Sequence, residues 1–199
     1  MSKGDTSMMY LISGLVLFLG VHSVRIVAED WRNHQRLQWG ANVWRAAYSL
    51  LSLAGLALII WGFGQARQQP VLLWMPPIGL RHLAILLTLP AFVLLAAAHV
   101  PGNRISARVH HPLTLSVKFW ALAHLMANGM LSHVLLFGSF LLWAVLAYAS
   151  ARRRDAASPP VPASIRKGAT GVTVAIGVAL WMTFTLWLHG LLMGVRPFG

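Results

Sequence analysis

Six runs of about twenty mostly apolar residues recur along this 199-residue chain, and they constrain its fold more than any other feature. A helix needs about 20 such residues to cross the hydrocarbon core of a bilayer. Backbone polar groups in lipid must be bonded internally, so each run predicts a helix. We therefore expect an all-α fold, a polytopic transmembrane helical bundle of about six spans. The expected spans are Met8–Val27, Trp44–Gly64, His82–Val100, Pro112–Asn128, Met130–Ala149 and Val172–Met193.

The spans recur over the whole length, so residues 1–199 are interpreted as a single transmembrane domain. A charged segment, Glu29–Arg36, is expected to connect the first two spans, and residues 150–168 form a basic, proline-rich linker. Residues 112–149 admit two interpretations, because the stretch could also be one long kinked helix. The turn dipeptide Asn128-Gly129 favours two spans.

Basic residues give the chain a net charge of +12, but they punctuate the apolar runs and do not gather on a soluble face. We therefore expect a lipid bilayer as partner and no nucleic acid. Twelve of the sixteen Lys and Arg fall in alternate connections, so the positive-inside rule makes that side cytoplasmic. The sequence predicts a multi-pass protein of the cell inner membrane with both termini periplasmic. The cytoplasmic twelve are Arg25, Arg32, Arg36, Arg45, Arg104, Arg108, Lys118, Arg152, Arg153, Arg154, Arg166 and Lys167.

The chain has no cysteine, which excludes disulfides, thiolate-ligated heme and thiolate-bound iron–sulfur clusters. Its four acidic residues lie outside the expected spans, which argues against carboxylate acid–base chemistry within the membrane. Imidazole is then the natural protein ligand for a buried metal or heme. Zinc is disfavoured, because neither a His-x3-His nor a His-Glu-x-x-His spacing occurs.

His22 and His124 lie in apolar runs, where a titratable ring is costly and indicates a functional site. A rise of about 1.5 Å per residue puts His22 roughly 7–8 Å from the cytoplasmic end of its span. If Lys118 lies among the headgroups, the same rise puts His124 about 9 Å inside the core, level with His22. This places the two rings face to face, as cofactor ligands in bundles are. A structural, hydrogen-bonded role for either ring is the alternative.

Several other positions have two interpretations. Arg25, one turn after His22, is either a topology charge or the partner of a propionate or phosphate group. His111 with Pro112 begins a helix whose free N–H groups attract anions, or it is an ordinary interfacial helix start. Asn128-Gly129 either closes a turn or lets a planar ligand approach the backbone. His99, His110 and His111 are expected near the cytoplasmic side and are the alternative candidates for a site. Seven glycines are expected to serve helix packing: Gly14, Gly20, Gly55, Gly62, Gly64, Gly171 and Gly177.

A set of spaced motifs extends over nearly the whole chain. It comprises Gly14-Leu-Val-Leu-Phe-Leu-Gly20-Val-His22-Ser23-Val-Arg25, His111-Pro112-Leu, Ala123-His124-Leu, Asn128-Gly129 and Leu135-Leu-Phe137-Gly138. With these motifs the chain resembles the NnrU family, small polytopic membrane proteins associated with bacterial denitrification. That family is similar to plastid 15-cis-ζ-carotene isomerase, which carries heme b on two histidines. By motif, those iron ligands fall on His22 and His124.

The resemblance implies a heme-b protein of nitrite and nitric oxide metabolism, with redox-dependent ligand exchange at a bis-histidine heme. Arg25, His111 and Asn128 are the other cofactor-binding candidates. One alternative is a heme-dependent cis-trans isomerase of a hydrophobic substrate; another is a non-enzymatic assembly or electron-relay factor for a membrane reductase. Whether the chain is an enzyme stays open. Met130 replaces an acidic residue expected after Asn128-Gly129, which counts against the isomerase.

Overall fold

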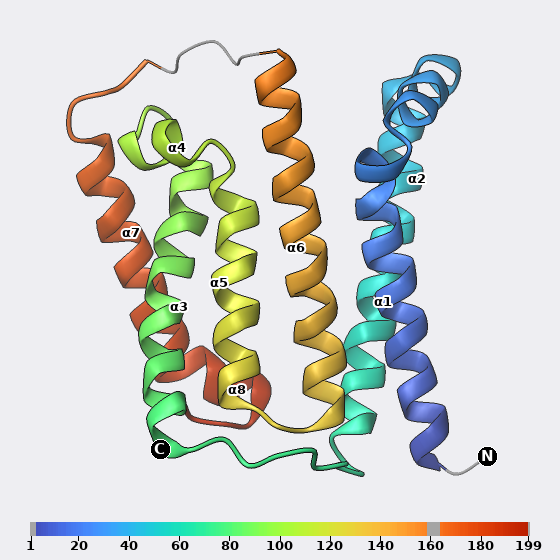
Figure 1. Cartoon of the computed structure of the whole chain (residues 1–199), viewed down its shortest axis with the longest axis vertical. Coiled ribbons are helices and arrows are strands. Elements are labelled where there is room, and N and C mark those ends of the chain that lie inside the picture. Colours follow the sequence, from blue (N-terminus) through green and yellow to red (C-terminus); the bar gives the residue numbers. More distant parts are fainter. Residues whose placement is uncertain (1–2, 159–163, 199) are drawn as a thin grey trace. The chain divides into compact units, whose positions relative to one another are not determined.

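The computed structural model describes residues 3–158 and 164–198 and is all-α over them, apart from one isolated β-bridge (Figure 1). The predicted fold class is confirmed. The helices are α1 (Lys3–Val27), α2 (Glu29–Ala66), α3 (Ile78–His99), α4 (Arg104–Val109), α5 (Pro112–Ala127), α6 (Leu131–Ala157), α7 (Ala169–Thr183), the π-helical η1 (Phe184–Leu188) and α8 (His189–Met193).

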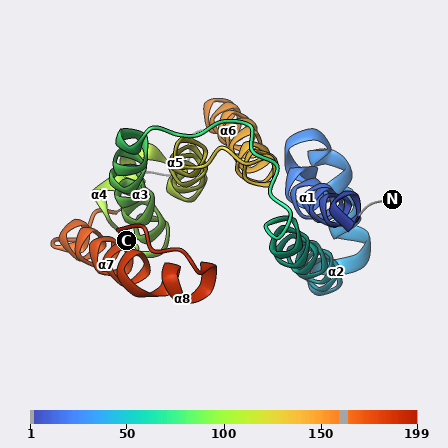
Figure 2. The same cartoon turned by 90° about the horizontal axis from the view of Figure 1, so that it is seen from below.

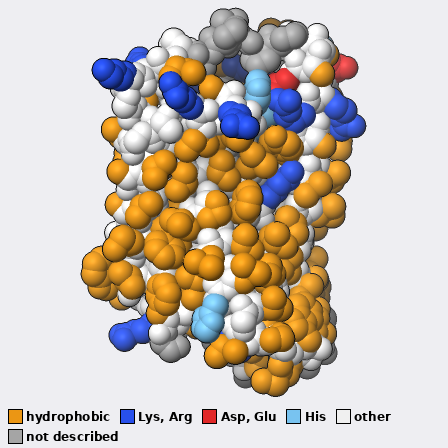
Figure 3. Space-filling model, turned by 60° about the vertical axis from the view of Figure 1, so that its left-hand side comes forward, with side chains coloured by type: hydrophobic (Ala, Val, Ile, Leu, Met, Phe, Trp, Pro, Cys, Tyr) orange, Lys and Arg blue, Asp and Glu red, His pale blue; other side chains and the backbone are white. Residues whose placement is uncertain are grey.

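Within the described part of the chain, five helical stretches are long and apolar enough to cross a membrane. They are Thr6–Val27, Glu29–Ala66, Ile78–His99, Leu131–Ala157 and Ala169–Met193. Large apolar side chains such as Val16, Leu86 and Leu191 are exposed on them. The face drawn in Figure 3 is mostly hydrophobic, with Lys and Arg gathered mainly toward one end. This is the pattern of a multi-pass membrane protein.

Helix α5 corresponds to the fourth expected span, Pro112–Asn128, and it is shorter than the five stretches above. Its 16 residues reach about 24 Å at a rise of 1.5 Å per residue, less than the roughly 30 Å hydrocarbon core. Residues 128–130 separate it from α6 in non-helical conformation, so residues 112–149 form two helices. The prediction of a break at Asn128-Gly129 is confirmed.

Two expected connections differ from the structure. The charged segment Glu29–Arg36 is helical, because α2 begins at Glu29 and continues past a break at Gly40, whose φ is 78°. Glu29 and Asp30 in its first turn complement the helix dipole. Helix α6 extends to Ala157, so the start of the expected linker, residues 150–157, is helical. The Pro159–Pro162 stretch, expected to be extended, lies outside the described residues.

The chain divides into two compact units. Unit 1 comprises Met1–Met75 and Asn128–Ala147, and unit 2 comprises Pro76–Ala127 and Tyr148–Gly199. Helix α6 therefore contributes its first part to unit 1 and its last part to unit 2. The interpretation of the chain as a single domain stays a prediction.

In unit 1, helices α1 and α2 pack closely along their length (Figure 2). A Cβ atom at Gly14 would lie 2.6 Å from the Ile59 backbone nitrogen, and one at Gly55 would lie 2.8 Å from that of Phe18. Gly62 meets the backbone of Leu11 in the same way. Residue numbers that increase along α1 meet residue numbers that decrease along α2, so the two helices are antiparallel. The predicted packing role of these glycines is confirmed.

Of the remaining four glycines expected to serve packing, one contacts another helix and three face open space. Gly177 on α7 packs against the Val93 backbone of α3, within unit 2. Gly20, Gly64 and Gly171 have no atom within 4 Å of an added Cβ, so the packing prediction is wrong for them in this chain.

A short extended segment closes one end of unit 1. Leu73 donates its N–H to the Gly129 carbonyl at 2.8 Å, and Leu131 donates to the Val71 carbonyl at 2.9 Å. An added Cβ at Gly129 would overlap the Trp74 carbonyl. Backbone therefore occupies the space beside Gly129, which favours the turn interpretation of Asn128-Gly129 over the approach of a planar ligand.

In unit 2, helix α3 lies between α5 and α7 and packs on both (Figure 2). Ser116 of α5 donates to the Ala91 carbonyl at 2.7 Å, and Trp181 of α7 donates to Thr88 Oγ1 at 2.9 Å. Asn103 is buried and caps α4, accepting from the Ser106 N–H at 2.7 Å. Polar side chains thus hold this unit together where apolar packing alone would not fix a register.

Candidate functional site

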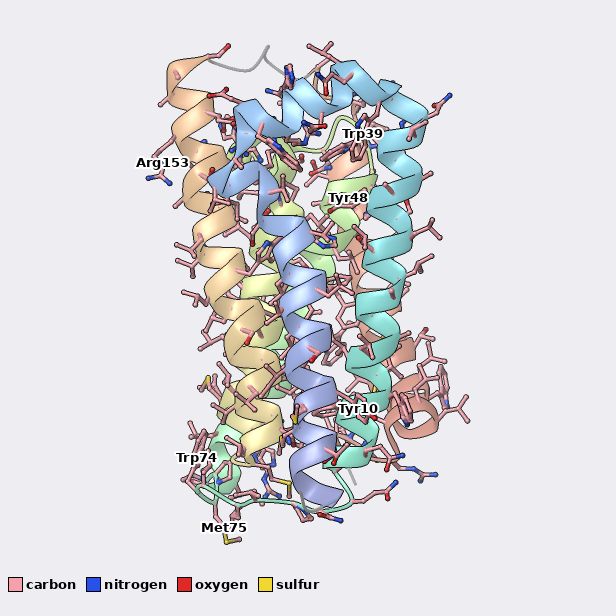
Figure 4. The ribbon with its side chains drawn as sticks, turned by 90° about the vertical axis from the view of Figure 1, so that its right-hand side faces the viewer. Tyr10, Trp39, Tyr48, Trp74, Met75 and Arg153 are labelled. Atoms are coloured by element: carbon pink, nitrogen blue, oxygen red, sulfur yellow. The ribbon has the colours of Figure 1, made fainter. Side chains whose placement is uncertain are left out.

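His22 of α1 lies among aromatic rings within unit 1. The Phe18 ring stacks on it with centroids 4.2 Å apart, Tyr48 of α2 lies at 5.2 Å, and Trp143 of α6 meets it edge-on at 6.0 Å. Figure 4 labels Tyr48 on α2, and Tyr10 farther along the α1–α2 pair. The aromatic rings limit how far the imidazole can turn.

The tautomer of His22 follows from its hydrogen bond. Its Nδ1 lies 2.7 Å from the Phe18 carbonyl oxygen, which can only accept, so the ring nitrogen is the donor. The lone pair is then on Nε2. A metal-ligating histidine is commonly held in this way, by a bond from its other nitrogen to a backbone carbonyl.

Two buried polar atoms of unit 1 lack a hydrogen-bond partner among the described residues: Trp143 Nε1, whose ring contacts His22, and Ser52 Oγ. Ser52 lies on α2, one turn from Tyr48, and its hydroxyl can rotate toward a carbonyl of its own helix. The indole N–H of Trp143 has no such freedom. A buried donor without an acceptor costs free energy unless a bound group or water supplies one.

Arg25, the candidate partner for a propionate, pairs with a protein carboxylate. Its Nε donates to Glu29 Oε1 at 3.1 Å, across the short break between α1 and α2. The Arg25 side chain is 56% exposed. An exposed pair of this kind contributes little stability and can exchange partners.

His124 lies one turn before the end of α5, in unit 2, and its ring faces a second histidine. The centroids of His124 and His189 are 6.4 Å apart, with ring planes 24° from parallel. His124 Nδ1 lies 2.8 Å from the Trp120 carbonyl oxygen, so this ring has the same tautomer as His22. The sequence interpretation did not bring His189 into the site.

The depth predicted for His124 rests on Lys118, which was expected among the headgroups because a buried ammonium is costly. In the structure Lys118 Nζ lies 4.2 Å from the centroid of the Tyr148 ring, a cation–π contact that stabilises the charge. The depth of α5 in a bilayer, and with it the depth of His124, stays a prediction.

His111 belongs to a separate polar cluster in unit 2. Its Nε2 lies 3.0 Å from Asp155 Oδ2, an atom that also accepts from Arg152 at 3.3 Å and lies 3.7 Å from His110 Nδ1. Pro112 begins α5, as expected. The acidic residue that sequence analysis placed in a linker is thus the centre of the cluster.

His110 has a strained backbone beside that cluster. Its φ of 63° and ψ of −47°, with the His111 N–H donating to the Val109 carbonyl at 2.8 Å, define a γ-turn of the rare positive-φ form. Among the described non-glycine residues, only His110 has a positive φ. Such strain persists where surrounding contacts enforce it, and it is common at functional sites.

The expected trio of His99, His110 and His111 is only partly assembled. His110 and His111 share Asp155, whereas His99 Nδ1 is bonded to the Leu95 carbonyl of its own helix at 2.8 Å and the side chain is exposed. Asn128 lies in the turn of unit 1, next to Gly129. The assignments of Arg25, His111 and Asn128 to a cofactor stay predictions.

The family model described as NnrU protein matches residues 10–197, nearly the entire chain. The chain belongs to the NnrU family. Searches of curated proteins and of solved structures gave no match. For this NnrU protein, the matched region includes all the histidines of both units.

Sequence reasoning missed three features of the sites in this NnrU protein. Trp143 and Tyr48 surround His22, and His189 faces His124. The available signal for His189 was its place in an apolar run beside Trp187. The signal for Trp143 was weaker, because tryptophan near a span end is also typical of the aromatic belt.

Proposed function

We propose that this NnrU-family protein is an integral membrane heme-b protein with His22 and His124 as iron ligands. The donor chemistry supports the proposal. Both rings donate Nδ1–H to a carbonyl of their own helix, which puts the lone pair on Nε2, the nitrogen that would bind iron. The similarity of the NnrU family to an isomerase that carries heme b on two histidines supports the same pair.

The residues around His22 suit a bound cofactor with polar edges. Phe18 and Tyr48 supply apolar ring faces. The Trp143 N–H, which has no partner among the described residues, could donate a hydrogen bond to a propionate oxygen. Arg25 is close along the helix and exchanges its exposed Glu29 partner at low cost. These residues bind and orient; none is placed in a proton-transfer role.

We infer a role in nitrite and nitric oxide metabolism from the family resemblance. When bound, heme supplies an iron that changes oxidation state and binds nitric oxide. Two protein ligands on the iron would exclude gases until one of them leaves, so a change of ligand would control access. The chain is proposed to lie in the inner membrane with both termini periplasmic, on the distribution of Lys and Arg.

The test is the absorption spectrum of the protein purified in detergent and loaded with hemin. We expect a reducible, low-spin Soret band that is altered in His22→Ala and in His124→Ala. His99→Ala is the matched control, because His99 makes the same Nδ1-to-carbonyl bond on an exposed face. Spectra unchanged in both His22→Ala and His124→Ala would reject the ligand assignment.

A second measurement separates a gas-handling protein from an electron relay or assembly factor. Carbon monoxide or nitric oxide added to the reduced protein binds if a ligand can leave. A relay with two permanent ligands would resist both gases, and an assembly factor that needs no heme would carry no pigment.

A further inference from the structure

We infer that His189 is a second imidazole able to bind the iron that His124 holds, in place of His22. The inference rests on the proposed heme and gives its ligand exchange a named residue. His124 and His189 both belong to unit 2, so their separation is defined within one compact part of the chain.

The separation of the two rings suits a shared metal ion. Metal–nitrogen bonds of about 2 Å put the centroids of two imidazoles on opposite sides of one ion roughly 6 Å apart. The His124 and His189 centroids are 6.4 Å apart. Rings in direct stacking contact lie closer, as Phe18 and His22 do at 4.2 Å.

His189 is also held in the tautomer of a ligand. Its Nδ1 lies 2.6 Å from the Val195 carbonyl oxygen, so the ring donates from Nδ1 and the lone pair is on Nε2. The turn that returns Val195 to His189 depends on Gly194, whose φ of 69° suits glycine. The bond from Nδ1 to the Val195 carbonyl orients the ring, as such bonds orient metal-ligating histidines.

The backbone directly before His189 is irregular, and this irregularity sets the direction in which the ring points. Residues Phe184–Leu188 form a π-helical turn, and such turns often occur at functional sites. The extra residue rotates the positions that follow it around the helix axis relative to a regular helix. The Phe184 ring contacts His189 at 5.9 Å and Phe92 of α3 at 5.6 Å, which limits the motion of the imidazole.

The exchange is a substitution of one neutral ligand by another. His124 and His189 would hold the iron through Nε2, and His22 would be the ligand that His189 replaces. Each ring keeps its proton on Nδ1, so no proton or electron is transferred and no co-reactant is required.

The experiment compares hemin-loaded variants by absorption and electron paramagnetic resonance of the ferric protein. His22→Ala keeps a six-coordinate, low-spin signal from His124 and His189, but its g values and Soret maximum shift because a ring of different orientation completes the coordination. Adding His189→Gln to it lowers that signal at least fivefold in favour of a high-spin one, and free imidazole restores it. His189→Leu is the second variant should the glutamine protein fail to fold. The control, His22→Ala with His99→Gln, keeps the low-spin signal.

The outcomes separate this inference from the proposed function. A high-spin His22→Ala protein, identical to the double variant, overturns the role of His189 while confirming His22 as a ligand. A low-spin signal that survives in His124→Ala, His22→Ala and the double variant rejects the proposed heme ligands altogether. A spectrum unchanged in His22→Ala but lost in the double variant supports His189 and makes it the resting ligand.

Discussion

The two units build their histidine environments in different ways. In unit 1 the helices are regular around His22, and glycines at positions 14, 55 and 62 bring α1 and α2 into backbone contact. In unit 2 the backbone is irregular just before two of the histidine contacts, at the γ-turn of His110 and at the π-helical turn before His189. The first irregularity precedes the contact of His111 with Asp155, and the second precedes the contact of His189 with His124. Close packing fixes a ring in unit 1, whereas backbone distortion aims rings in unit 2.

The largest effect on stability is expected from filling the glycine contacts of unit 1. A Cβ at Gly62 would lie 2.8 Å from the Leu11 Cα, so Gly62→Ala forces the two backbones apart. We expect a loss of about 1–3 kcal/mol, measured as a fall of several degrees in the melting temperature in detergent. Gly64→Ala, two residues away in open space, is the control. Equal melting temperatures for both variants would contradict the close approach.

The strain at His110 is tested by which variant is more stable, His110→Gly or His110→Ala. Glycine adopts a positive φ without cost, so His110→Gly should be more stable than His110→Ala by about 1–3 kcal/mol. At His34, an exposed helical position of α2, the same pair should reverse, with alanine better by about 1 kcal/mol. Thermal unfolding of the four proteins measures both differences. An alanine variant that is the more stable at both positions would show that His110 is unstrained.

The same two units contain tryptophans that differ in their hydrogen bonding. Trp181→Phe removes the donor to Thr88 in unit 2, whereas Trp143→Phe removes a donor without a protein partner in unit 1. We expect the first change to cost about 1 kcal/mol more than the second in the heme-free protein. Melting curves compare them. A larger loss for Trp143→Phe would reveal an acceptor for its N–H.

A smaller effect is expected from the cluster around Asp155. Asp155→Asn removes the carboxylate that His111 and Arg152 share, and the partly exposed site limits the loss to about 1 kcal/mol. Asp30→Asn, at an exposed position in the first turn of α2, is the control and should lower the melting temperature less, because it loses only an exposed interaction with the helix dipole. High salt should reduce the difference between the two variants. If it does not, the Asp155 contacts are not electrostatic.

The helices were predictable because apolar length alone requires them in a bilayer, and the break at Asn128-Gly129 carries its own turn signal. The pairing of His124 with His189 was not predictable. It depends on a π-helical turn at Phe184–Leu188, and no sequence pattern there indicates such a turn. The contact of Lys118 with the Tyr148 ring was not predictable either, because that ring comes from another helix. Contacts made by the tertiary fold lie beyond pattern and spacing.

The central claim, that His22 and His124 bind heme iron, is tested most directly by one spectrum. Purified protein should show the sharp Soret band and the split visible bands of reduced low-spin heme, and these should be lost or altered on replacing either histidine. Protein that stays colourless after hemin is added and unbound hemin is removed would contradict the account.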